Sequence, residues 1–253
     1  MKKVILSLSL MLCLFVASAQ NVYVKYEFMK QLPGQDYEKL EKSWVNYHKE
    51  LINAGIITMH RVWKVLPGND VDYDYVVTTV YNNYEDALGI GKSISVDDFK
   101  KKYPEDYEVM VSTTLKTRTM VRDVIMSLDL PLGPKNYDLT PGVSLMSMNF
   151  IKSKNGKYED AEIAFSKKWH NGLINNGNKM AFNFMHSMGG QGTESRFSHI
   201  ITHLFSNMEQ MNKKVDMTKF KMTPEETASY NNLVTYRDIT KIVLHVNVMN
   251  LEN

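Results

Sequence analysis

The sequence predicts an α+β protein built from two similar units, each with the order strand–helix–strand–strand–helix–strand. Two observations carry this prediction. A β-branched and aromatic run occurs at 73–85 and again at 197–209, and the two copies match at a spacing of 124 residues. The alternating and helix-periodic segments also follow in the same order around each copy. We therefore interpret the chain as a tandem duplication, with units at 20–134 and 135–253.

The first nineteen residues have the features of a signal peptide. Two lysines precede an apolar run from Val4 to Val16, and Ala17-Ser-Ala19 supplies the small residues of a cleavage site. The run is too short for a membrane span. It also contains Cys13, the only cysteine, so we expect no disulfide after cleavage. These features predict export to the periplasm or the extracellular space.

Charge argues against a polyanionic partner. The chain has 30 lysines and arginines against 28 acidic residues, and removal of the two lysines of the signal peptide balances them. A near-neutral chain without basic clusters favours neither nucleic acid nor an anionic membrane as the main partner.

The first unit begins with a strand at 22–30. Its alternation places Val24, Tyr26 and Phe28 on one face, and Lys25 and Glu27 on the other. Because this strand is expected at the middle of its sheet, two charges on one face require pairing or a wet cavity.

A helix follows, with Asp36 as its N-cap and Gly55 at its end. Strands are predicted at 56–66 and 73–81, then a helical stretch over 84–107 that glycines and a proline interrupt. The last strand covers 116–128, and Pro131-Leu-Gly-Pro134 is predicted to be the linker. In the strand at 56–66, Arg61 and Trp63 share one face, and the sequence leaves open whether it points inward.

The second unit repeats this order. Strands are predicted near 146–152, 179–188, 197–205 and 236–249, with a glycine-rich turn at 189–192. The first helix of this unit runs from Tyr158 to Gly177. Its apolar stripe matches the first unit at a spacing of 121 but its end matches at 122, so either one residue is inserted in this helix or the alignment of the two units slips there. His48 and His170 align at a spacing of 122 near the ends of the two helices, where a structural role is expected.

Each unit then forms a four-stranded antiparallel sheet with both helices on one face, the ferredoxin-like arrangement. The other face stays bare, and the two bare faces can bury each other. We therefore expect the two sheets to face each other in an α+β barrel, with space for a ligand between them.

The chain resembles the dimeric α+β-barrel superfamily, which includes antibiotic-biosynthesis-type monooxygenases and NIPSNAP-like domains. The resemblance is carried by Tyr81-Asn-Asn-Tyr-Glu-Asp-Ala87 and Phe205-Ser-Asn-Met-Glu209, where an aromatic residue ends the third strand before a polar turn. It implies a fold and a pocket, and reactions that range from cofactor-independent oxygenation to haem chemistry. Haem-degrading members carry a histidine on the second helix, but neither 82–102 nor 206–230 contains one. We therefore expect no cofactor.

His199 and His203 are the leading candidates for catalysis. They alternate with Ile200 and Leu204 along one strand. We expect the aliphatic face to lie under the helices, so that the histidines point between the sheets. Four residues of strand span about 13 Å, too far for both to bind one metal ion, and no metal site is predicted. The alternatives are a neutral imidazole that hydrogen-bonds in a polar pocket, and a general base.

The leading hypothesis is a binding protein for a small, partly apolar molecule held between the sheets. Besides the two histidines, the predicted lining consists of Tyr75, Thr79, Tyr81 and Phe205, with Lys25 and Glu27 as polar groups. The alternatives are a cofactor-independent oxygenase or isomerase that uses a pocket histidine, and a packed interaction module without a pocket. Ser147 and Asn149 replace Lys25 and Glu27 in the second unit, so the pocket is expected to be asymmetric. If only one pocket is active, we expect it on the side of the second unit, where His199 and His203 replace Tyr75 and Thr79.

Overall fold

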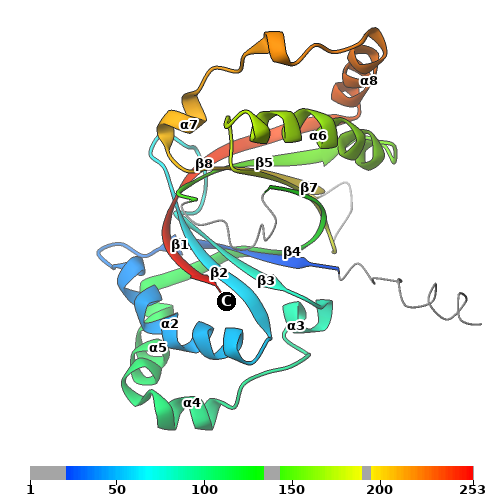
Figure 1. Cartoon of the computed structure of the whole chain (residues 1–253). Coiled ribbons are helices and arrows are strands. Elements are labelled where there is room, and N and C mark those ends of the chain that lie inside the picture. The colour runs from blue at the N-terminus through cyan, green and yellow to red at the C-terminus, as the bar shows by residue number, and fades with distance from the viewer. Residues whose placement is uncertain (1–20, 134–142, 190–194, 253) are drawn as a thin grey trace, which may run out of the picture.

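A computed structural model describes residues 21–133, 143–189 and 195–252 (Figure 1). The predicted signal peptide lies outside these ranges, as do Pro134 of the predicted linker and residues 190–192 of the predicted glycine-rich turn. The strands form the middle of the molecule, between one layer of helices from the first half of the chain and another from the second half (Figure 1). No helix in the described ranges is long and apolar enough to cross a bilayer.

The first half has the predicted order, with three short helices in place of the second one. Its elements are β1 (Tyr23–Gln31), α2 (Tyr37–Asn53), β2 (Ile57–Val65), β3 (Tyr75–Tyr81), α3 (Tyr84–Leu88), α4 (Val96–Lys102), α5 (Pro104–Thr117) and β4 (Arg118–Leu132). Gly89 ends α3 in the left-handed region, at φ 75°, and Pro104 opens α5 at its first position. Pro131 and Leu132 pair with β6, so the predicted linker is strand at its first two residues.

The second half follows the same order. Its elements are β5 (Leu145–Ser153), α6 (Tyr158–Asn175), β6 (Ala181–Ser187), β7 (His199–Phe205), α7 (Met208–Asn212), the 3-10 turn η3 (Met217–Lys219), α8 (Pro224–Thr235) and β8 (Arg237–Glu252). Helix α6 has 18 residues where α2 has 17, the difference expected from one inserted residue.

Polar residues before each helix explain where several of them start. The side chains of Asp36, Asn83 and Asn207 each accept a hydrogen bond from the backbone N–H three residues later. Thr223 and Glu226 form a capping box at the start of α8. These caps satisfy N–H groups that have no partner within the helix.

The eight strands close into one barrel, in the order β1-β3-β2-β8-β5-β7-β6-β4. The four strands of each half are neighbours, and the halves join at both edges, through β2–β8 and β4–β6. The prediction of two facing ferredoxin-like sheets in an α+β barrel is therefore confirmed, and the edge pairing adds its closure. Closure leaves no strand edge unpaired.

The barrel is filled by side chains. One apolar cluster takes members from all eight strands, which is possible only inside the barrel: Val24, Tyr26, Phe28, Met59, Trp63, Val76, Val80, Met126, Met146, Met148, Phe150, Ala181, Met185, Ile200, Leu204 and Val243. An eight-stranded barrel is just wide enough for its side chains to fill. The interior is therefore a core, and Trp63 and its face of β2 point into it.

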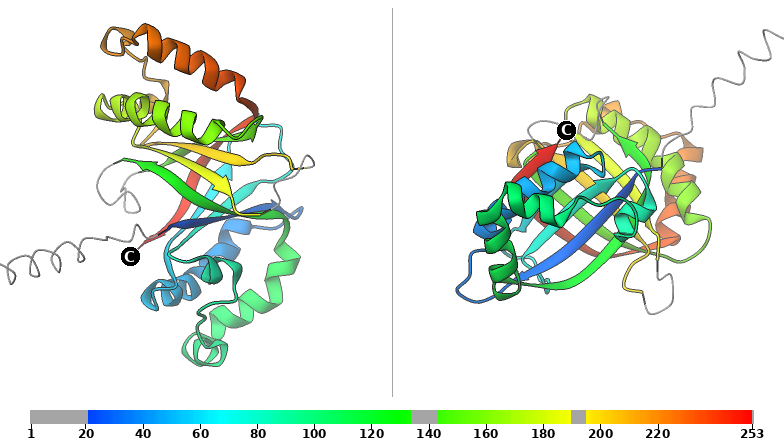
Figure 2. Two further views of the ribbon diagram at one scale, coloured as in Figure 1. Left: turned by 90° about the vertical axis from the view of Figure 1, so that its right-hand side faces the viewer. Right: turned by 90° about the horizontal axis from the view of Figure 1, so that it is seen from below.

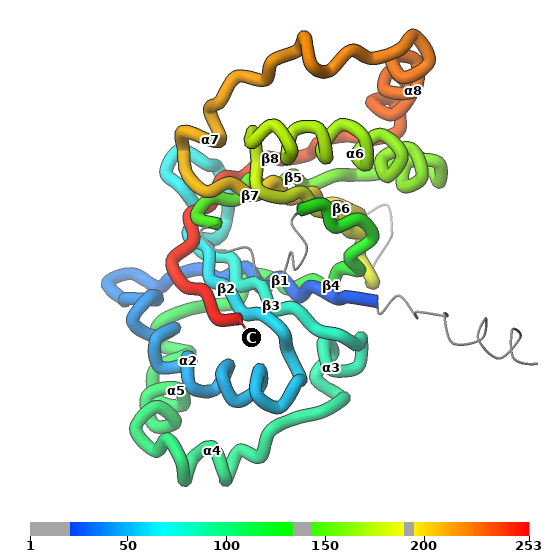
Figure 3. Tube along the Cα trace, in the orientation of Figure 1, coloured from blue at the N-terminus to red at the C-terminus, as the bar shows by residue number. Residues whose placement is uncertain are grey.

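The two helix layers differ in how closely they cover the barrel. In the first half, α2 and α5 lie side by side over the sheet (Figures 1 and 2). In the second half, the segment 213–223 arches over α6 on its way to α8 (Figure 3). That arch leaves a groove.

Candidate functional site

The predicted orientation of His199 and His203 is wrong. Because Ile200 and Leu204 fill the barrel, the histidines between them point outward, under α6. His199 Nε2 lies 3.1 Å from the Glu159 carboxylate at the start of that helix. His203 lies at the other end of the helix, so the two histidines belong to separate groups of contacts.

The other predicted pocket residues also face outward. Tyr75 packs in an apolar cluster beneath α2, and Thr79 Oγ1 lies 3.2 Å from His60 Nδ1 in the same layer. Tyr81 packs against a cluster around Ile57. Phe205 shares the outward face of β7 with His203. The structure therefore does not bring these residues together with the histidines between the sheets.

Lys25 and Glu27 pair with each other instead of lining a cavity. Their charged groups lie 3.5 Å apart, and Lys25 also lies 3.6 Å from Asp123 on β4. Both side chains are partly exposed, on the face of β1 opposite the barrel core. Pairing and partial exposure to water therefore offset the cost of two charges on this face.

Two hollows with aromatic walls lie over the second half. Two adjoining pockets, of about 580 and 390 Å³, share Phe165, Trp169 and Met222 as lining residues. The larger lies between α6, the arch and α8, and the smaller reaches the outer face of the sheet. Together they form what we call the α6–α8 groove.

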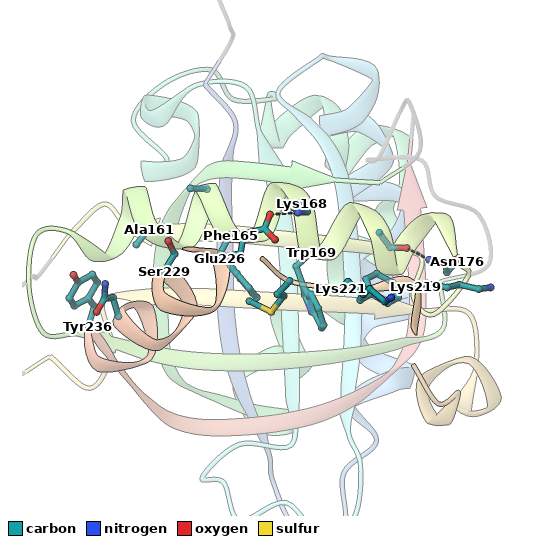
Figure 4. A pocket seen from close by; sticks show the side chains of 15 residues that line it. Ala161, Phe165, Lys168, Trp169, Asn176, Lys219, Lys221, Glu226, Ser229 and Tyr236 are labelled. Atoms are coloured by element: carbon teal, nitrogen blue, oxygen red, sulfur yellow. Dashed lines mark hydrogen bonds and ion pairs between the residues drawn. The ribbon is translucent and has the colours of Figure 1, made fainter. Parts of the chain in front are cut away.

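Aromatic rings form the walls of the groove (Figure 4). Phe165 and Trp169 stack on one face of α6, with ring centroids 5.9 Å apart. Tyr230 of α8 lies 5.1 Å from Phe165, and Phe220 of the arch lies 5.2 Å from Trp169. Gly172 permits this approach, because a Cβ there would come within 2.5 Å of the Phe220 ring.

The floor of the groove is polar. His170 of α6, His203 of β7 and Asn149 of β5 line the smaller pocket. Behind them, the Lys179 ammonium lies 2.8 Å from His203 Nδ1 and 3.2 Å from His170 Nδ1. When Lys179 is charged its ammonium only donates hydrogen bonds, so each Nδ1 accepts and the hydrogen of each neutral ring then sits on Nε2.

Burial sets the protonation of this cluster. It lowers the pKa of Lys179 to about 7. Burial, followed by the Lys179 charge, holds the pKa of His203 well below its usual range, and the same two causes act on His170. Both rings are therefore neutral at physiological pH, and Lys179 is the group in the floor that titrates there.

A second polar pair lines the same pocket, and its two charges neutralise each other. Arg237 of β8 lies 2.5 Å from the Glu162 carboxylate, which also accepts a hydrogen bond from Ser166 Oγ at 2.8 Å. Glu162 is buried. Arg237 therefore neutralises the Glu162 charge, and Glu162 forms no described ion pair with Lys179.

The first half contains a corresponding cluster, and the helices of that half cover it. His48 and His60 stack with centroids 3.5 Å apart, as His170 stacks on Phe182 at 3.9 Å. His60 pairs with Thr79 across the strands, as Phe182 pairs with His203. Trp44 and Tyr47 of α2 pack against His48, and Phe99 of α4 packs on Tyr47.

Two other hollows carry charges that pair among themselves. In a hollow of about 750 Å³ among the loops of the first half, Lys30 meets Asp74 at 3.0 Å and Lys64 meets Glu38 at 2.8 Å. In one of about 460 Å³ at a mouth of the barrel, Asp72 lies between two arginines. Behind the floor of the α6–α8 groove, by contrast, lies a buried lysine, Lys179, with no carboxylate among its described contacts.

Comparison with known proteins identifies relatives by fold alone. No protein-family model matches the sequence, and the search of curated proteins gives no match. A candidate monooxygenase from Fusobacterium nucleatum superposes with a TM-score of 0.59 at 7% identity, over 93% of this chain and 96% of that one. A candidate monooxygenase from Lactobacillus acidophilus gives 0.51 at 11% identity, over 92% and 96%. A candidate chlorite dismutase gives 0.50 at 10% identity, over 91% and 96%. The chain shares the α+β-barrel fold of these proteins.

The resemblance also raises haem as a ligand, and the histidines of the groove do not fit it. A histidine that binds a metal normally donates its other ring N–H to an acceptor. Here the Nδ1 of His170 and of His203 faces a lysine ammonium, which leaves the hydrogen on Nε2. Within the described ranges, no group of three or more His, Cys, Asp or Glu side chains is arranged to hold a metal ion.

The sequence pointed to His203 but missed Lys179. The sequence feature that could have identified Lys179 is a difference between the two units: at a spacing of 122, Lys179 corresponds to Ile57. A lysine in place of a buried isoleucine indicates a group placed for a purpose other than packing. The aromatic walls were read only as the core-facing stripe of a helix.

Proposed function

We propose that the protein binds a small, largely aromatic molecule in the α6–α8 groove. The observation that carries the proposal is a pair of adjoining pockets with aromatic walls and a polar, partly titratable floor. Ligand sites typically combine apolar walls with a few placed polar groups. This differs from the sequence hypothesis in location, since the ligand lies outside the barrel and under the helices.

The proposal includes export and duplication. The basic, apolar and small-residue pattern of residues 1–19 supports passage through a membrane before the groove meets its ligand. Two observations support a duplication: the elements follow the same order in both halves, and α6 differs from α2 in length by one residue. In this proposal, one copy has an open groove and the other does not.

Filling the groove tests the binding function. Ala164 lies exposed on α6 and lines the larger pocket. In Ala164→Trp the indole occupies that pocket, so binding of the neutral aromatic probe 2-naphthamide, measured by calorimetry, should fall at least about tenfold. The matched control is Val111→Trp on the exposed face of α5, which should bind as the wild type does.

Two results would overturn the binding function. One is the absence of 2-naphthamide binding to the wild-type protein at millimolar concentration. The other is equal binding by the wild type and Ala164→Trp. Mass spectrometry of small molecules that co-purify with the protein then identifies the natural occupant.

A cofactor-independent oxygenase or isomerase is the second candidate. Lys179, with a pKa of about 7, and the pocket-lining His203 favour it, because proton abstraction needs a group poised near neutrality. The two neighbours described as candidate monooxygenases share the fold. The low pKa of His203 makes it a weak base, so Lys179 is the better candidate for that role.

Oxygen uptake distinguishes an enzyme from a binder. If the protein catalyses oxygenation, an oxygen electrode should record oxygen consumption with phenols as substrates. Lys179→Met should abolish this consumption while 2-naphthamide still binds. If His203→Ala stops turnover and Lys179→Met does not, the general base is His203, as the sequence predicts. Equal loss of turnover and probe binding would point back to a binding protein.

A further inference from the structure

Lys179 is a buried lysine without a carboxylate among its described contacts. It is 7% exposed, and its described partners are two neutral imidazoles. A buried ammonium without a counter-charge is destabilising unless an anion comes to it. None of the described ion pairs supplies one.

The charged groups around Lys179 do not provide the missing anion. His170 faces it from α6 and His203 from β7, and both are neutral. Arg237 on β8 adds a further positive charge, and Glu162 on α6 is taken up by Arg237. On the loop side, Lys213 donates to the backbone oxygen of Asn176. The floor of the groove therefore has an excess of positive charge.

Folding does not require a lysine here. The corresponding position of the first half is Ile57, fully buried, and Thr79 stands where the second half has His203. The first half thus builds the same strands with apolar and hydroxyl groups. The substitution in the second half coincides with the open groove.

We propose that the floor of the groove is a subsite for the carboxylate of an aromatic acid, with Lys179 as its counter-charge. Asn149 Nδ2 lies 3.4 Å from His203 Nε2, so with the hydrogen on Nε2 two N–H donors face each other without an acceptor between them, and both residues line the pocket. The carboxylate accepts from the His203 Nε2–H and the Asn149 amide, while the aromatic body lies between Trp169 and Tyr230. This rests on the proposed binding function and names the class of its ligand.

The subsite makes affinity depend on pH. Lys179 in the free protein loses its proton near pH 7, whereas a bound carboxylate favours the charged form. Affinity for the acid should therefore be constant below that pH and fall about tenfold per unit above it, with proton uptake on binding. A neutral ligand of the same shape should show neither effect.

A matched pair of probes tests the subsite. Calorimetry compares 2-naphthoate with 2-naphthamide, which differ in charge but scarcely in shape. At pH 6, naphthoate should bind about 10- to 100-fold more tightly, the range of a hydrogen-bonded charge pair. At pH 8, titrations in buffers of different ionisation enthalpy should show uptake approaching one proton per naphthoate and none for naphthamide.

Variants assign the effect to Lys179. Lys179→Met should lose the preference for naphthoate and keep naphthamide binding, and Ile57 shows that an apolar side chain is tolerated at the corresponding position. Lys179→Arg should keep the preference without the pH dependence. Lys39→Met, which removes an exposed lysine of α2 that lines neither pocket of the groove, should behave as the wild type.

Each opposing result has a separate meaning. Naphthamide binding without preference for naphthoate, or a preference that survives in Lys179→Met, overturns the subsite and leaves the binding function. Failure of both probes overturns both. If Lys179→Met does not fold, two measurements still test the subsite: the proton uptake of the wild type and the pH profile of Lys179→Arg.

Discussion

Each half of the molecule covers its own four-stranded sheet with helices, and the two helix layers are packed differently. In the first, Phe99 of α4 packs edge-on against Tyr47 of α2 at 5.4 Å, and Asn46 bonds to Asp106 of α5 at 2.7 Å. In the second, α6 meets the arch and α8 through Trp169–Phe220 and Phe165–Tyr230 contacts that border a groove.

The histidines beneath these layers differ accordingly. His48 and His60 are sealed by their helices, whereas His170 and His203 line a pocket. Corresponding residues can therefore be structural in one half and available to a ligand in the other. The helix layer makes the difference.

The largest expected effect breaks the closed layer. Phe99 is 4% exposed, so Phe99→Ala should lower the free energy of unfolding by about 3–4 kcal/mol through the cavity it leaves. Phe220→Ala removes a half-buried ring from the arch and should cost only about 1 kcal/mol. Urea denaturation measures both, and equal losses would show that the arch is as firmly packed as α4.

The sealed histidines should make stability depend on acid. Burial, followed by the charge of Arg118, lowers the pKa of His60 to about 3, while the unfolded chain protonates near 6.5. The folded state therefore loses about 1.4 kcal/mol per pH unit from this group as the pH falls below 6.5. Urea denaturation at pH 7.5, 6 and 5 should show His60→Gln losing less stability on acidification than the wild type. Parallel curves would contradict this.

Gly172 sharpens the comparison from the open side. In Gly172→Ala the new Cβ, 2.5 Å from the Phe220 ring, should push the arch outward. Loss of the Trp169–Phe220 contact, worth about 0.5–1.5 kcal/mol, should weaken 2-naphthamide binding about 2- to 10-fold. Stability should not fall, because alanine favours a helix over glycine by about 1 kcal/mol. Unchanged binding would mean that Phe220 does not shape the groove.

The smallest effect concerns the rim. Lys168 of α6 pairs with Glu226 of α8 across the groove, and both groups are open to solvent. Exposed ion pairs contribute little because water and salt screen them. Lys168→Met should therefore leave the unfolding midpoint unchanged in a thermal scan. A clear drop would show that this pair holds α8 in place.

The sequence by itself determined the order of the elements and most of their ends. Alternation marked the strands, and Asp36 and Gly55 marked the ends of α2, because caps and left-handed turns depend on a residue and its immediate neighbours. The extra residue of α6 was also visible in the spacings.

Only the tertiary structure decided which face of each strand points inward. In a closed barrel under helices both faces are buried, so hydrophobicity does not distinguish them. Ile200 and Leu204 go inside, and His203 goes outside, where it meets Lys179 from the loop before β6. That lysine and the histidine are 24 residues apart in the chain. Their contact exists because β6 and β7 pair beneath α6, and no local pattern records it.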